Sequence, residues 1–166
     1  MATAKLGGDA GVALATPDPA VRRATDRDLE EMTSLWLGCI VTSNTARDIE
    51  DAFRVHGRYF FVRIGGDGLE GFAAGTVKSR TRGHVSGVAV RPELRGRGLG
   101  RGLMRATEEA FRADGFTRVT LEVRPSNAAA LQFYEGLGYR KVYRVPEYYF
   151  DGEDALVCEK NLLRLP

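Results

Sequence analysis

The segment from Val88 to Met104 constrains this chain more than any other part of the sequence. An apolar β-type run, Val88-Ala89-Val90, meets a turn dense in glycine and arginine, and a helical pattern of apolar residues follows at once. The first N–H groups of a helix lack intrahelical partners and lie at the positive end of its dipole. Glycines let an anion approach the backbone closely, and arginine keeps its charge. The sequence therefore predicts a strand–turn–helix unit that holds a phosphate group.

Other interpretations of this turn fit less well. A Walker loop needs Gly-Lys-Ser/Thr after its glycines, and this turn lacks that tripeptide. A dinucleotide-binding turn lies near the start of a βαβ unit and has an acidic residue about 20 residues on. Glu122 lies near that distance, so spacing alone leaves this interpretation open, but residues 1–87 precede the turn and no second Rossmann half follows. The alternative to phosphate binding is an ordinary surface turn whose arginines are solvated.

Two motifs carry a family resemblance. The pattern Arg95-x-x-Gly98-x-Gly100 resembles the acetyl-CoA motif of the GCN5-related N-acetyltransferase (GNAT) family, and residues 119–139 resemble its later strand–helix unit. The resemblance implies an α/β GNAT fold, a mixed central sheet of about seven strands sandwiched by about four helices. It also implies acetyl-CoA as co-substrate and no metal. The cofactor-binding residues that it implies are Val88, Ala89, Val90, Arg95, Gly96, Arg97, Gly98, Leu99, Gly100, Arg101, Asn127 and Tyr134.

Within that family, the chain is most similar to peptide N-terminal acetyltransferases of the bacterial RimI type and of the archaeal and NatA types. The likeness extends over about residues 20–163 and is strongest from residue 83 onward. It implies direct transfer of an acetyl group, in a ternary complex, to the N-terminal α-amine of a protein or peptide. An α-amine has an ordinary pKa of about 7.7–8.0, against about 10.4 for lysine, so a modest base suffices.

Glu122 and Tyr134 are the catalytic candidates. Glu122 stands in the middle of a β-type run, and by resemblance it is the general base; Tyr134 follows twelve residues later and by resemblance protonates the leaving thiolate. A salt bridge with a neighbouring arginine, or an exposed edge position, is the structural alternative for Glu122. For Tyr134 the alternative is core packing with Leu131 and Leu137.

Two further residues have expected roles near the reacting groups. Asn127 suits a helix N-cap, and by resemblance it contacts the pantetheine arm. The resemblance also implies that the backbone N–H of Val90 binds the thioester oxygen, where two strands splay apart.

Tyr148 and Tyr149 are the substrate-binding candidates, because in the family paired tyrosines of the final hairpin hold the peptide. An aromatic pair packed in the core is the alternative. Residues 38–45 lack the proline and tyrosine that archaeal and NatA-type enzymes have in the corresponding loop. The polar residues 42–44 suit small first residues such as Ser or Ala. Because of this difference in residues 38–45, two other functions stay open: an acetyltransferase of small amines or internal lysines, and a non-catalytic acyl-CoA sensor.

Periodicity and turn signals predict the elements in order. They are a strand at 21–24, a helix from 25 or 26 to about 37, a helix at 45–55, strands at 59–64, 69–78 and 84–90, a helix at 98–113, a strand at 117–123, a helix at 127–136, and strands at 139–146 and 154–162. This order predicts a three-layer α/β sandwich.

Length and charge suit one domain over residues 20–166, after a Gly/Ala/Pro-rich tail at 1–19 that is expected to be disordered. The net charge of +2 indicates neither a nucleic-acid nor a membrane partner. No apolar run reaches the length of a membrane span or signal core, which favours a cytoplasmic location. We expect a monomer or weak homodimer whose partner is a protein or peptide N-terminus.

The cysteines and histidines do not indicate a metal. Cys39 and Cys158 are far apart in apolar contexts and are expected to be buried, reduced thiols. His56 and His84 have no metal-ligand spacing with them.

Overall fold

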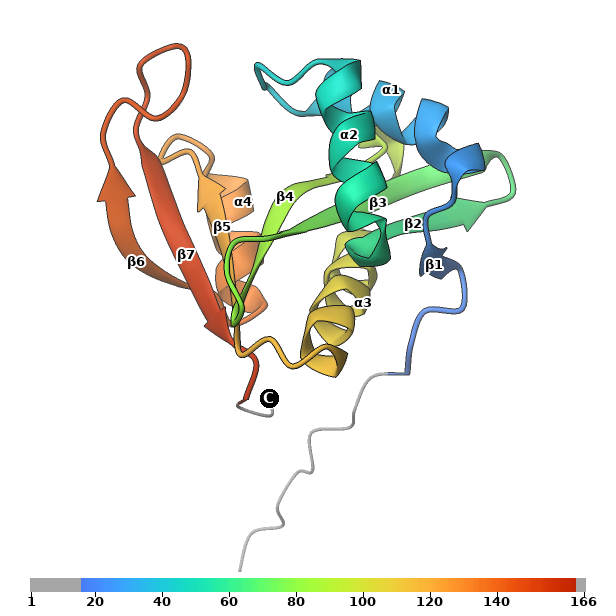
Figure 1. The fold of residues 1–166 in the computed structure, drawn as a ribbon. Helices are drawn as coiled ribbons and strands as arrows, with labels where there is room; N and C mark the ends of the chain where they lie inside the picture. The colour runs from blue at the N-terminus through green and yellow to red at the C-terminus, as the bar shows by residue number, and fades with distance from the viewer. Residues whose placement is uncertain (1–15, 164–166) are drawn as a thin grey trace, which may run out of the picture.

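The computed structural model describes residues 16–163, and in them a seven-stranded mixed sheet carries two helices on each face (Figure 1). The strand order is β1-β2-β3-β4-β5-β7-β6, and every neighbouring pair is antiparallel except β4 and β5. The strands are β1 (Val21–Arg23), β2 (Phe60–Gly65), β3 (Gly68–Val77), β4 (Arg82–Val90), β5 (Arg118–Val123), β6 (Arg140–Val145) and β7 (Ala155–Asn161). The helices are α1 (Leu29–Cys39), α2 (Ala46–His56), α3 (Leu99–Ala113) and α4 (Ala128–Gly136), with short 3-10 turns at Asp26–Asp28, Gly57–Tyr59 and Pro92–Leu94.

The sheet has a hydrophobic core on each face because successive side chains of a strand point to opposite sides. Phe60 and Val62 of β2 pack under α1 and α2, whereas Phe61 between them packs under α3. The α3 face continues under α4, where Val119, Leu121 and Val123 of β5 are buried. Thr120 and Glu122, at the alternate positions of β5, therefore point to the face that α1 and α2 cover.

The first helix begins differently from the expectation. Residues 26–28 form a 3-10 turn, and α1 then continues to Cys39, beyond the expected end near residue 37. Asp28 closes a capping box with Thr25 and binds Arg22 with its two carboxylate oxygens. The hydrogen bond from Arg22 is the main cause that lowers the pKa of Asp28 to about 2.

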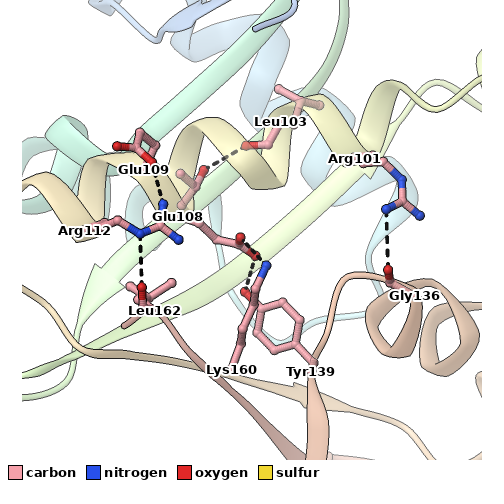
Figure 2. A network of polar contacts seen from close by, with 10 residues as sticks. Arg101, Leu103, Glu108, Glu109, Arg112, Gly136, Tyr139, Lys160 and Leu162 are labelled. Carbon is pink, nitrogen blue, oxygen red and sulfur yellow. Dashed lines mark hydrogen bonds and ion pairs between the residues drawn. The ribbon is translucent and has the colours of Figure 1, made fainter. Parts of the chain in front are cut away.

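Helix α3 is fastened to the C-terminal part of the sheet by polar contacts that Figure 2 shows. The buried carboxylate of Glu108 accepts hydrogen bonds from the Tyr139 hydroxyl, at 2.9 Å, and from Lys160 Nζ, at 2.6 Å. Arg101 donates to the carbonyl of Gly136 at one end of α3, and Arg112 donates to that of Leu162 at the other. These contacts join α3 to α4, to the turn before β6, and to β7.

The chain is already ordered at the end of the expected tail. The carboxylate of Asp18 accepts hydrogen bonds from the amide of Ala20 and from Arg63 Nε, at 2.9 Å each. Residues 1–15 of that tail lie outside the described residues. None of the helices in the described part is both long and apolar enough to span a membrane.

Candidate active site

Strands β4 and β5 separate soon after they meet. Their parallel pairing runs only from Arg82 opposite Arg118 to His84 opposite Thr120. Ser86 is then skipped in the pairing of β4 with β3, which marks a β-bulge that bends β4. The strands diverge from there, as expected from the resemblance, and a groove of about 780 Å³ opens between them. This volume lies in the usual range for cofactor and ligand sites.

One end of the groove is formed by the turn before α3. Gly96 and Gly98 have φ angles of +76° and +79°, a left-handed conformation that favours glycine. No side chain caps the first N–H groups of α3, and the described residues leave open space around both glycines. A Cβ on Gly100 would lie 3.2 Å from the ring of Phe133, so α3 and α4 approach closely here. This end therefore presents unpaired backbone donors and arginines to an anion.

Most of the residues predicted to hold the cofactor line this groove. They are Val88, Ala89, Val90, Arg95, Gly96, Gly98, Leu99, Gly100, Arg101, Asn127 and Tyr134. Arg97 does not line it, although it belongs to the same turn. Asn127 caps α4 with a hydrogen bond from the amide of Ala130 to its side-chain oxygen, at 3.1 Å, as its sequence position predicts.

The backbone of β4 presents amides to the groove. The amide of Arg91 donates to the backbone carbonyl of Glu70 in β3, at 2.8 Å. Because peptide groups alternate along a strand, the N–H groups of Val88 and Val90 point away from β3 and toward the groove. The carbonyl of Val90 accepts a hydrogen bond from Arg95 Nε, at 3.1 Å, which agrees with this orientation.

Glu122 is held by a histidine, not by the arginine or the edge position that the structural alternative offered. His84 Nε2 lies 2.9 Å from Glu122 Oε2, and its Nδ1 lies 3.1 Å from the Thr120 hydroxyl. The side chain of Glu122 is 18% exposed and lines the groove. Burial alone would raise the pKa of Glu122, but the hydrogen bond and charge of His84, together with Lys78, hold that pKa below its usual value. Glu122 is thus a carboxylate that stays ionised at neutral pH.

Tyr134 reaches the groove from the other face of the sheet. It lies on α4, packs against the core under α3 and α4, and touches the ring of Tyr139 edge-on. Burial raises the pKa of Tyr134 to about 12, with smaller contributions from Cys158 and Tyr149. Its hydroxyl therefore remains protonated through the neutral range. The groove thus has a carboxylate on one face of the sheet and a phenol on the other.

Tyr148 and Tyr149 lie in the loop between β6 and β7, not on strands of the core. Tyr149 lines the groove, whereas the ring of Tyr148 packs edge-on against the ring of Tyr149. The Arg124 guanidinium lies 3.9 Å from the centre of the Tyr149 ring and bridges to Asp151 and Glu153, at 2.7 and 2.9 Å. The loop is therefore fixed to the end of β5 by Arg124.

The segment after α1 forms the opposite wall. Cys39, Ile40 and Val41 line the groove, whereas the polar residues 42–44 do not. Both cysteines were expected to be buried. Cys158 is buried, but Cys39 is only half-buried because it lies at the end of α1. Residues 16–163 contain no group of three His, Cys, Asp or Glu side chains arranged to hold a metal ion.

His84, Arg124 and Phe133 were not predicted from the sequence to be site residues. His84 is separated from Glu122 along the chain, and only the parallel pairing of β4 with β5 brings them together. Arg124 lies two residues after Glu122, and its position before the Pro125-Ser126-Asn127 turn was the available signal.

The comparisons with known proteins bear on the family and the fold. Residues 22–139 match the model of the acetyltransferase (GNAT) family. An uncharacterized N-acetyltransferase of Methanocaldococcus jannaschii is 30% identical over 142 residues, which are 85% of this chain and 90% of that protein. The catalytic subunit NAA20 of the Arabidopsis thaliana N-terminal acetyltransferase B complex is 39% identical over 111 residues, 64% of each chain.

Ard1 from Thermoplasma volcanium superimposes with a TM-score of 0.82 at 28% identity, over 87% of this chain and 97% of that one. This similarity confirms the expected mixed seven-stranded sheet with four helices. Since the family match covers most of the sequence and the archaeal relative is aligned over nearly its whole length, the chain belongs to the GNAT family of N-acetyltransferases.

Proposed function

We propose that this protein transfers the acetyl group of acetyl-CoA to the N-terminal α-amine of a protein or peptide. The observation that carries the proposal is that one groove is lined both by the glycine–arginine turn before α3 and by the Glu122 carboxylate. The relatives support the choice of acceptor. An N-alpha-acetyltransferase of Sulfurisphaera tokodaii is 41% identical over 85 residues, 49% of each chain.

The residues at the turn fit the phosphates of coenzyme A. The open space at Gly96 and Gly98, the uncapped first turn of α3, and Arg95 and Arg101 on the groove suit a pyrophosphate. Arg97 does not line the groove, but it belongs to the same turn and stays a candidate for binding the phosphates of coenzyme A. Asn127 and Phe133 then line the path toward the reacting end. Acetyl-CoA supplies the activated thioester carbonyl.

Glu122 is proposed to take a proton from the amine, directly or through a water molecule. The amine nitrogen attacks the thioester carbonyl carbon, and the nitrogen loses one proton to the carboxylate. His84 can satisfy both of its neighbours, because its Nε2–H donates to Glu122 while its Nδ1 shares a hydrogen bond with the Thr120 hydroxyl, which can donate or accept. This arrangement keeps one carboxylate oxygen hydrogen-bonded and leaves the other for the amine.

The carbonyl oxygen gains charge as the bond to nitrogen forms. The N–H groups of Val88 and Val90 are the proposed donors, since both point into the groove. The carbon–sulfur bond then breaks, and the Tyr134 hydroxyl is the proposed hydrogen-bond donor and proton source for the leaving sulfur. Because Glu122 and Tyr134 lie on opposite faces of the sheet, acceptor and co-substrate can occupy the gap together, as direct transfer requires.

A mass-spectrometric assay tests this function. Purified protein and acetyl-CoA are offered short peptides with a free α-amine, the same peptides with a blocked N-terminus, and blocked peptides with an internal lysine. We expect acetylation of the free α-amines alone. Transfer to lysine in blocked peptides, or binding of acetyl-CoA without transfer to any peptide, would shift the assignment to a lysine or small-amine acetyltransferase. The loop at 38–45, which lacks proline and tyrosine, is the feature that favours that second candidate.

A further inference from the structure

The two ends of the groove differ in chemistry, and the difference bears on the acceptor. The turn before α3 presents backbone donors and arginines, whereas the end near Glu122 is walled by Cys39, Ile40 and Val41 on one side and by Tyr149 on the other. If the co-substrate is anchored by its phosphates at the turn, the acceptor enters from the Glu122 end. This step rests on the proposed function.

Apolar side chains gather at that entrance. In Figure 1 the α1–α2 and β6–β7 loops project from the same edge of the molecule, above the ends of β4 and β5. Val41 on the first loop is 64% exposed; Tyr148 and Phe150 on the second are 48% and 69% exposed. Large apolar side chains that remain exposed together mark surfaces that bind an apolar group.

The two charged residues that line this end of the groove, Glu122 and Arg124, already have partners. Glu122 is engaged by His84, and Arg124 is engaged by Asp151 and Glu153 while it stacks on Tyr149. An acidic or basic side chain at the first position of the acceptor would lose water here without gaining a free counter-charge among the described lining residues. Such desolvation is unfavourable.

We infer that the first residue of the acceptor has an apolar side chain, such as that of Leu or Met. This side chain packs between Ile40 and Val41 on one wall and Tyr149 on the other, while its α-amine reaches Glu122. The inference differs from the expectation of Ser or Ala, which rested on residues 42–44. Those residues stand outside the lining, because the chain after α1 turns its apolar residues toward the groove.

A matched peptide series tests the inference. The peptides differ only at the first residue, which is Leu, Met, Ser, Asp or Lys, and kcat/KM is measured for each. We expect Leu and Met to exceed Ser, Asp and Lys by about tenfold or more, the usual discrimination by an apolar pocket. Equal or higher values for Ser, Asp or Lys would overturn the inference.

A pair of variants locates the preference on the α1–α2 loop. Val41→Glu should lower kcat/KM for the Leu and Met peptides about tenfold and raise it for the Lys peptide. Val55→Glu is the matched control, because Val55 is 74% exposed on α2 and outside the groove lining. It should leave the series unchanged, and both variants should keep wild-type affinity for acetyl-CoA.

The outcomes separate the two proposals. Equal effects of the two variants, or acetylation of free α-amines without regard to the first residue, would overturn the inference and leave the proposed function intact. Acetylation of none of the free α-amine peptides would overturn both.

Discussion

Glu122 and His84 form a contact that only the fold creates. The two side chains point to the same face, because His84 pairs with Thr120 in the short parallel ladder and Glu122 lies two residues further along β5. The strand position of Glu122 and its role as a candidate base could be predicted from alternation and resemblance. Its partner could not, because single-sequence patterns do not reveal which strands pair.

The contact predicts a pH effect. Since the folded protein lowers the pKa of Glu122, its carboxylate loses the ability to accept a proton only as the pH falls below the usual range for glutamate. In His84→Ala, burial is no longer opposed by the histidine, and the pKa of Glu122 rises. While the acceptor amine alone titrates, log kcat/KM rises with pH with a slope of about one. Where Glu122 titrates as well, the slope is about two. The change from one slope to the other should occur at a higher pH in the variant than in the wild type. A profile that steepens at the same pH in both would contradict the role of His84.

Tyr134 gives a second prediction. Tyr134→Phe retains the packing against Tyr139 but removes the hydroxyl that is proposed to act on the leaving sulfur. We expect kcat to fall about 100-fold, within the usual range for a lost general acid. Tyr139→Phe is the control, because its hydroxyl binds Glu108 away from the groove. If Tyr134→Phe retains full kcat, the packing alternative is correct.

At the scale of the elements, the contacts of Arg124 fix the position of the β6–β7 loop. Besides the two ion pairs of Arg124, Glu153 accepts a hydrogen bond from the amide of Ser126, at 3.0 Å, so the loop is also bound to the turn before α4. The two strands that flank the loop could be predicted from their alternation. The position of the loop could not, because it depends on contacts between residues that lie 27 and 29 positions apart.

Loss of this tie should affect the acceptor and not the co-substrate. In Arg124→Met we expect KM for the peptide to rise about tenfold, because Tyr149 loses its stacking partner and about 1–2 kcal/mol of positioning. The dissociation constant of acetyl-CoA, measured by calorimetry, should stay within twofold of the wild-type value. Arg118→Met is the matched control, since Arg118 begins the same strand and bridges to Glu159, outside the groove lining. A peptide KM that is unchanged in Arg124→Met would contradict this account of the loop.

For the molecule as a whole, α3 joins two parts of a sheet that separates between β4 and β5. Its apolar side packs on β2, β3 and β4, and its polar contacts reach α4, the turn before β6, and β7 (Figure 2). The amphipathic pattern of α3 predicted the apolar side. The burial of Glu108 was not predictable, because a glutamate at a helical surface position is usually solvated.

The Glu108 contacts predict a stability effect that can be separated from catalysis. Lys160→Met leaves a buried carboxylate without its cation, which should lower the free energy of unfolding by about 3 kcal/mol. The double variant Glu108→Met/Lys160→Met removes both charges and should recover at least half of that loss. Urea unfolding of the three proteins checks this. A single variant as stable as the wild type would mean that the ion pair contributes nothing to the fold.

The most direct test of the account is a single-turnover comparison of wild-type protein and Glu122→Gln on one peptide with a free α-amine. Acetyl-CoA binding is measured on both proteins by calorimetry. We expect the variant to bind acetyl-CoA with wild-type affinity and to transfer the acetyl group at least about 100-fold more slowly, because the amide cannot accept the proton. Transfer within a few-fold of the wild-type rate would contradict the claim that the Glu122 end of the groove is where the acceptor amine reacts.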